Sequence, residues 1–175
     1  MIPHVAVLNS APLMLLGNEI APRRTCCLLA NLNSLALDFV ARQKVGGVHL
    51  NFFIVEQLPL FAPDKYAERC PWNRRQTLEK WVSDRVLKLT CTADDMRPLA
   101  EAAGFEPPVH KWNATEREDL VAELDAAFLL LYGLDRDDAQ YVLASFQGRE
   151  PGGGLFAVED AVLAAYDRLA AGKWL

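Results

Sequence analysis

The sequence lacks a long hydrophobic run and an obvious targeting segment. No apolar stretch reaches the about 20 residues that a membrane-spanning helix needs, although just over half of the 175 residues are hydrophobic. The N-terminus also lacks the basic region of a signal peptide, so we expect a cytoplasmic protein without membrane association. The apolar content is sufficient for a buried core, which argues against a chain that is disordered throughout.

Cysteine and histidine are few and are poorly spaced for metal binding. The four cysteines are Cys26, Cys27, Cys70 and Cys91. None has the two-residue spacing of a zinc knuckle, and an adjacent pair is a poor framework for disulfides, so we expect reduced thiols that fill the core. The three histidines are His4, His49 and His110, and they have no ligand spacing among themselves. We therefore expect no metal site.

Positive charge is scarce overall but unevenly distributed. The net charge is −5, which alone argues against nucleic-acid binding. The first hundred residues hold 12 basic and 9 acidic side chains, whereas the last seventy-five hold 6 basic and 14 acidic ones. Phosphate contacts require cations, so any DNA would contact the first part. The acidic remainder is expected to face solvent or a protein partner.

The pattern of apolar residues predicts a mainly α fold with a small β part (α+β). We expect an N-terminal hairpin at residues 5–16, then a helix from Pro22 to about Gln43, a loop and a further apolar run. Prolines at positions 59, 63 and 71 indicate a linker. They divide the chain into residues 1–62, with the mixed α/β character, and residues 63–175, a bundle of about four to five helices.

Capping residues and glycines define the expected ends of the later helices. The first of these helices should begin near Arg74 and run to about Leu89. Asn113 and Asp135 have the side chains preferred at helix N-termini. Glycines at positions 104, 133 and 172 are expected to end helices.

The stretch from Leu28 to Leu60 carries the candidate binding residues. Cations stand where a helix should end, a glycine pair then permits a close approach of the backbone, and the apolar run Phe52–Val55 should bury the far side of the loop. Arginine and lysine contact phosphates, and asparagine reads adenine through two hydrogen bonds. The candidate DNA contacts are Arg42, Lys44, Gly46, Gly47, His49 and Asn51. The alternative is that Arg42 and Lys44 form a solvated helix end while Asn51 caps the next turn.

This stretch resembles the end of the target-recognition domain in bacterial restriction-modification proteins. These include the adenine-N6 DNA methyltransferases of type IIG systems and, more distantly, the specificity subunits of type I systems. The matching segments are Leu28-Leu29-Ala30, Leu32-Asn33-Ser34, Gly46-Gly47, Asn51-Phe52-Phe53 and Gln57-Leu58-Pro59.

The second half resembles the C-terminal helical extension of the same methyltransferases. Two segments carry this similarity, Arg85 to Gly104 and Glu123 to Phe146. The chain departs from the family after Phe146, where many relatives have a basic, glycine-containing run. The resemblance implies that the chain is, or descends from, the C-terminal piece of a larger polypeptide.

The family's catalytic motifs are missing from this sequence. There is neither a glycine-rich loop for S-adenosylmethionine nor an Asn-Pro-Pro-Tyr loop for the flipped base, and Glu106-Pro107-Pro108-Val109 lacks the flanking amide and aromatic residue. We therefore expect a non-catalytic DNA-recognition and helical portion of a restriction-modification methyltransferase. Its partners would be double-stranded DNA and a catalytic domain or subunit that holds S-adenosylmethionine. The alternative is an acidic helical module that docks on a methylase or nuclease subunit.

Two further groups of charged residues have open interpretations. Asp125 is either a buried structural carboxylate or an ordinary residue on a helix face. Arg74 and Arg75, beside Trp72, either contact phosphate or form a solvated helix start, and the sequence favours the second.

Overall fold

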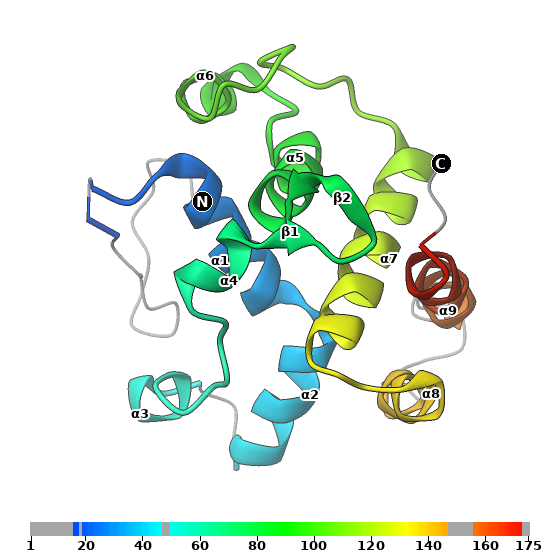
Figure 1. Cartoon of the computed structure of the whole chain (residues 1–175). Coiled ribbons are helices and arrows are strands. Elements are labelled where there is room, and N and C mark those ends of the chain that lie inside the picture. Colours follow the sequence, from blue (N-terminus) through cyan, green and yellow to red (C-terminus); the bar gives the residue numbers. More distant parts are fainter. Residues whose placement is uncertain (1–15, 18, 47–49, 147–155, 173–175) are drawn as a thin grey trace.

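The computed structural model describes residues 16–17, 19–46, 50–146 and 156–172. These residues form nine α-helices, one 3₁₀ helix and a two-stranded antiparallel sheet, which confirms the prediction of a mainly α protein with a small β part (Figure 1). The sheet comes from residues 69–77, where no strand was expected. The expected N-terminal hairpin falls, except for Leu16, outside the described residues. None of the described helices has both the length and the apolarity to cross a membrane.

The elements before the sheet are four helices. They are α1 (Pro22–Asn33), α2 (Leu35–Lys44), α3 (Phe52–Val55) and α4 (Pro63–Ala67). The sheet consists of β1 (Arg69–Cys70) and β2 (Asn73–Thr77). The elements after it are α5 (Leu78–Thr90), the 3₁₀ helix η1 (Asp94–Met96), α6 (Arg97–Ala102), α7 (Ala114–Leu131), α8 (Arg136–Ala144) and α9 (Phe156–Ala170).

Helices α5 and α7 form the centre of the molecule. α7 packs against α9, α2 and α5, while α5 packs against α1, α4 and both strands (Figure 1). Trp81 and Phe128 are the largest fully buried side chains, and they come from these two helices. Helices from both sides of residue 62 thus contribute to one hydrophobic core. The division of the chain at residue 62 stays a prediction.

The helix expected from Pro22 to Gln43 is in fact two helices that meet at Ser34. The Ser34 backbone is extended, with φ −72° and ψ 143°, so the α-helical hydrogen bonding stops there. Its side chain then accepts the Leu37 N–H at 3.3 Å and caps the new helix. Both helices pack on the same core, so the helical spacing of apolar residues continues across Ser34. The sequence pattern therefore gave no sign of the break.

The helix expected to begin near Arg74 begins at Leu78 instead. Thr77 caps α5 by accepting the Lys80 N–H at 3.2 Å, and the two arginines before it lie on β2. Their interpretation as a solvated helix start is therefore wrong. The proline-rich linker is also partly helical, because Pro63 occupies the first turn of α4, where its missing N–H costs nothing.

The other helix ends follow the sequence signals. The Asn113 side chain accepts the Glu116 N–H at 3.0 Å, and Asp135 accepts the amides of Asp137 and Asp138 at 3.0 and 2.9 Å. Gly104 and Gly133 have φ values of +60° and +77°, as the left-handed end of a helix requires. These predicted caps and stops are confirmed.

Candidate nucleic-acid interface

A buried carboxylate fixes the start of α2, the helix that leads to the predicted DNA-contact loop. Asp125 on α7 is only 6% exposed, and it accepts the Leu35 N–H at 2.8 Å. Burial raises the pKa of Asp125 to about 7, an effect that the bond from the Leu35 amide opposes. Because Ser34 caps the same helix end, two side chains satisfy amides that the helix leaves unpaired. Asp125 is thus a buried structural carboxylate.

A second buried polar group fixes the chain after the loop. The Asn31 amide donates to Tyr132 Oη at 2.7 Å, and that hydroxyl donates to the Pro59 carbonyl at 2.8 Å. Asn31 Oδ1 accepts the Phe61 N–H at 3.1 Å and the Tyr66 hydroxyl at 3.3 Å. Residues 59–61 are therefore tied to α1 and to the end of α7.

These two polar groups together hold the segment between Leu35 and Pro59 at both of its ends. Several of the residues concerned belong to the segments that carry the family resemblance, including Ser34, Pro59 and Asp125. Their role in the fold is to clamp this segment onto α7. A partner that contacts the loop would thus meet a segment whose ends are fixed, which lowers the entropic cost of binding.

The cations at the end of α2 differ in how far they are engaged. Arg42 Nη2 forms an ion pair with Asp38 Oδ2 at 2.7 Å, and its guanidinium carbon lies 4.8 Å from the centroid of the Phe146 ring. Lys44 is exposed and pairs with no acidic side chain in the described part of the chain. Lys44 is therefore the freer of the two to contact an external anion.

The loop itself is described only at its ends. Gly46 is exposed, does not have a positive φ, and has no atom within 4 Å of the position that a Cβ would occupy. The packing of the described chain therefore does not require glycine there. The other two predicted contacts in the loop, Gly47 and His49, lie outside the described residues.

Asn51 begins α3 through its backbone rather than its side chain. Its carbonyl accepts the amides of Ile54 and Val55 at 2.9 and 3.1 Å, whereas its side chain makes no capping bond. The Asn51 side chain is exposed and, among the described residues, makes no hydrogen bond, so its amide group can bond to another molecule.

The expectation that Phe52–Val55 buries the far side of the loop is wrong. Phe52 and Phe53 are 69% and 60% exposed, and only Ile54 is buried. In a helix successive side chains point about 100° apart, so a single turn packed on one side against α2 buries few of its side chains. Leu50 is also 44% exposed, so an apolar group borders the loop.

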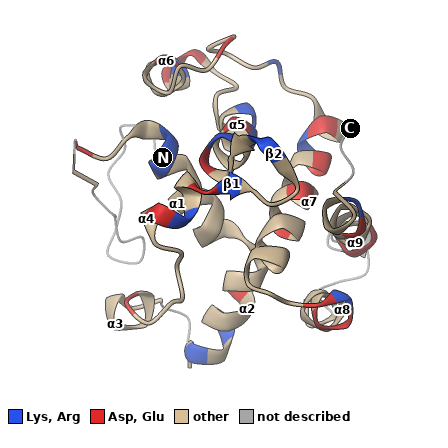
Figure 2. Ribbon diagram, in the orientation of Figure 1, with Lys and Arg blue, Asp and Glu red and all other residues tan. Residues whose placement is uncertain are grey.

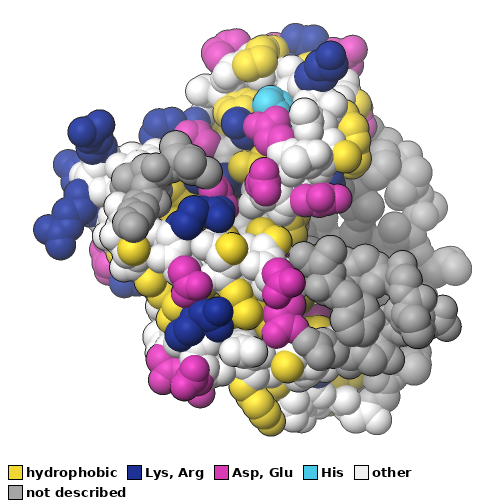
Figure 3. Space-filling model, turned by 90° about the vertical axis from the view of Figure 1, so that its right-hand side faces the viewer, with side chains coloured by type: hydrophobic (Ala, Val, Ile, Leu, Met, Phe, Trp, Pro, Cys, Tyr) yellow, Lys and Arg dark blue, Asp and Glu magenta, His cyan; other side chains and the backbone are white. Residues whose placement is uncertain are grey.

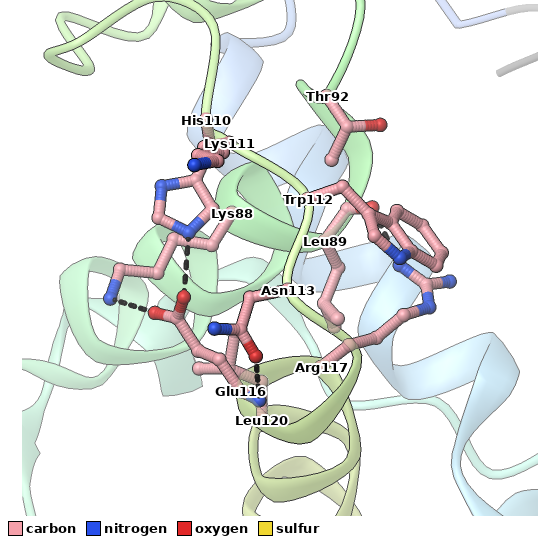
Figure 4. A pocket seen from close by; sticks show the side chains of 10 residues that line it. All are labelled: Lys88, Leu89, Thr92, His110, Lys111, Trp112, Asn113, Glu116, Arg117 and Leu120. Carbon is pink, nitrogen blue, oxygen red and sulfur yellow. Dashed lines mark hydrogen bonds and ion pairs between the residues drawn. The ribbon is translucent and has the colours of Figure 1, made fainter.

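A different cluster of charges surrounds a small hollow between α5 and α7 (Figure 4). Lys88 Nζ and His110 Nε2 contact the two carboxylate oxygens of Glu116 at 2.9 and 3.0 Å. Lys88 and then His110 lower the pKa of Glu116 through these bonds. The hollow holds about 10 Å³, roughly one water molecule, so it is too small for a substrate.

The other described hollow is larger but offers little chemistry. It holds about 580 Å³ beside α1 and α4 and is lined mainly by apolar side chains, with Glu19 and Arg24 among them. No group of three or more potential ligands that could hold a metal occurs among the described residues. Neither hollow brings together a nucleophile and a base.

The cysteines occupy the core, as the sequence predicted. All four are buried and free. Burial raises the pKa of Cys26 to about 12 and raises the pKa of Cys27 further, so both thiols stay protonated at neutral pH. A thiol in this state is a poor nucleophile.

Comparisons of this chain with family models, with curated proteins and with solved structures found no match.

Proposed function

We propose that this chain binds duplex DNA through the segment between α2 and α3. In this proposal it is the non-catalytic recognition and helical part that accompanies an adenine-N6 DNA methyltransferase. The observation that supports it most directly is the state of Lys44 and Asn51. Both side chains are exposed and form no ion pair or side-chain hydrogen bond within the described part of the chain, and they lie at the two ends of a loop on a clamped segment.

Each residue has a distinct role in the proposed contact. Lys44 would neutralise a phosphate, which adds affinity without reading the sequence. Asn51 would pair with an adenine edge, a contact worth about 1–3 kcal/mol of discrimination against other bases. Arg42 would contribute less than Lys44, because Asp38 and the Phe146 ring already hold its guanidinium group. The open space around Gly46 would allow the backbone to approach the duplex closely.

The chemistry of methyl transfer is proposed to lie elsewhere. S-adenosylmethionine and the flipped adenine would be held by a catalytic domain or subunit that acts together with this chain. This assignment follows from the catalytic motifs that the sequence lacks, the glycine-rich loop and the Asn-Pro-Pro-Tyr loop.

The proposal is tested by the salt dependence of binding to a random pool of short duplexes. Lys44→Ala should lower the affinity for every duplex and reduce the slope of log K against log salt by about 0.9, the loss of one phosphate contact. Lys111→Ala is the matched control, because Lys111 is also exposed and pairs with no described acidic side chain. Equal slopes for the Lys44 variant and the unmodified chain would contradict the proposal.

The exposed phenylalanines favour a second candidate function, docking on a methylase or nuclease subunit. Adjacent exposed aromatic side chains are typical of protein contacts. The acidic helices after Glu101 would face the same subunit. Phe52→Ser with Phe53→Ser should then abolish co-purification with that subunit in the absence of DNA. Tyr141→Ser provides the control, because Tyr141 is an exposed aromatic residue on α8.

A further inference from the structure

The hairpin formed by β1 and β2 has two side chains in the core and its arginines in solvent. Cys70 and Trp72 are buried, at 0% and 6% exposure. Arg69, Arg74 and Arg75 are all exposed. Figure 2 shows the resulting basic colouring of both strands, which lie in front of α5. The hairpin therefore presents three arginines on a base that is anchored in the protein.

Aromatic packing holds the turn of the hairpin in place. Trp72 lies in the two-residue turn, and its ring meets Trp81 of α5 edge to face, with ring centroids 5.1 Å apart. The Arg85 guanidinium covers Trp81, 3.5 Å from its ring centroid. The other end of the hairpin is fixed by the Leu78 N–H, which donates to the Glu68 carbonyl at 2.9 Å. These contacts leave the strands little freedom to move relative to α5.

The acidic side chains near the hairpin are already paired with other cations. Glu68 pairs with Lys65 at 2.7 Å, and Glu79 pairs with Arg24 at 3.4 Å. The third acidic residue, Asp84, pairs with two cations. Its carboxylate oxygens lie 2.6 Å from Arg23 Nη1 and 2.6 Å from Lys80 Nζ.

The hairpin arginines are consequently left without a counter-ion. None of the three forms an ion pair with an acidic side chain in the described part of the chain. Residues 69–77 contain three arginines and no acidic residue. Their positive charge therefore faces solvent. In Figure 3 the front of Figure 1 lies at the left-hand edge, where Lys and Arg side chains protrude.

We propose that the β1–β2 hairpin is a second DNA contact, which grips the sugar-phosphate backbone through Arg69, Arg74 and Arg75. This inference rests on the proposed function, since duplex DNA is the polyanion it names. Arginine suits this role because its planar guanidinium donates two parallel hydrogen bonds to one phosphate. The contact adds affinity and fixes the position of the chain on the duplex, while the loop after α2 reads the bases.

The chemistry favours phosphate over the carboxylates of a protein partner. Residues 69–77 hold three exposed arginines, and Pro71 in the turn is their one exposed apolar residue, so the segment matches a regular row of anions better than a mixed protein surface. Among the described residues, the exposed large hydrophobic side chains, Phe52 and Phe53 among them, lie outside the hairpin.

The test compares two double variants with the same change in charge. Arg74→Gln with Arg75→Gln should reduce the slope of log K against log salt by about 1.8, and should weaken binding roughly tenfold or more at physiological salt. All duplex sequences should be affected equally. Arg97→Gln with Lys111→Gln is the control for the change in charge, because Arg97 is an exposed cation on α6 that pairs with Asp94, Lys111 is an exposed cation in the segment before α7, and neither belongs to the hairpin. The melting temperatures of both variants should match that of the unmodified chain, since none of these four side chains is buried.

Asn51→Ala, measured in parallel, separates this inference from the proposed function. If the hairpin variant keeps the original slope while Asn51→Ala loses sequence preference, the hairpin inference is overturned and the proposed function stands. If the hairpin variant loses slope while Asn51→Ala keeps its preference, the hairpin inference stands and the loop does not read the bases. A chain that binds no duplex at any salt overturns both. Loss of co-purification with a protein subunit, without loss of DNA affinity, would assign the arginines to a protein partner and overturn the inference.

Discussion

Asp125 on α7 accepts a hydrogen bond from the backbone N–H of Leu35, the first residue of α2, at 2.8 Å. The two residues are 90 positions apart in the sequence. This single bond connects the most buried part of the helical core to the helix that leads into the proposed DNA-contact loop. The stability of that connection can be measured independently of any ligand.

Removal of the Asp125 carboxylate should destabilise the fold. Asp125→Ala leaves the partly buried Leu35 amide without its acceptor, which costs about 1–3 kcal/mol of unfolding free energy. Asp125→Asn should cost less, because its amide oxygen can still accept that bond. Urea denaturation gives the values. Asp119→Ala is the control, as Asp119 is exposed on the same helix and should change stability by about 0.5 kcal/mol or less.

The same carboxylate predicts a pH dependence of stability. Burial raises the pKa of Asp125 from 3.8 to about 7 in the folded protein. Between about pH 4 and about pH 7 the folded chain therefore holds a proton that the unfolded chain has released. The free energy of unfolding should fall as the pH rises through this window, by at most about 1.4 kcal/mol per pH unit from this group. Relative to Asp125→Asn, the unmodified chain should lose stability across the window. Parallel stability curves for the two proteins would contradict this assignment.

The hydroxyl of Tyr132 should matter both for stability and for the shape of the recognition segment. Tyr132→Phe removes the donor to the Pro59 carbonyl and the acceptor for the Asn31 amide, so we expect a loss of about 1–3 kcal/mol. Hydrogen exchange should become faster at the Phe61 amide, because its acceptor, Asn31, loses a partner. Tyr141→Phe is the control, since Tyr141 is 71% exposed, its ring meets that of Phe39 edge to face, and its hydroxyl makes no hydrogen bond within the described residues. Equal stability of the two variants would show that the Tyr132 bonds contribute nothing.

Local signals in the sequence were sufficient to place most helix ends. Asn113 and Asp135 cap helices through side-chain hydrogen bonds to amides two or three residues away, and Gly133 ends a helix through its own positive φ. None of these three signals depends on the rest of the fold. The break at Ser34 was missed for the opposite reason. Its extended backbone is supported by Asp125, a residue from another helix that no local pattern could connect with it.

Two other features could not be predicted because they violate average tendencies. The hairpin at residues 69–77 has a proline in its turn and asparagine and arginines in its strands, without the alternation of apolar and polar residues that identifies a strand. They form because Cys70 and Trp72 pack onto α5. The exposure of Phe52 and Phe53 was missed because burial of apolar residues is a tendency, and part of every protein surface is apolar.

The most direct test of the central claim is selection of bound duplexes from a random pool by the unmodified chain, by Asn51→Ala and by Asn33→Ala. Asn33 is a matched control, because it is an exposed asparagine whose side chain, within the described part of the chain, bonds to the Leu29 carbonyl of its own helix alone. The account predicts that the unmodified chain and Asn33→Ala enrich the same base sequence, and that Asn51→Ala loses the preference for adenine at one position within it. Enrichment of that same sequence by Asn51→Ala with unchanged affinity, or enrichment of none by the unmodified chain, would contradict the account.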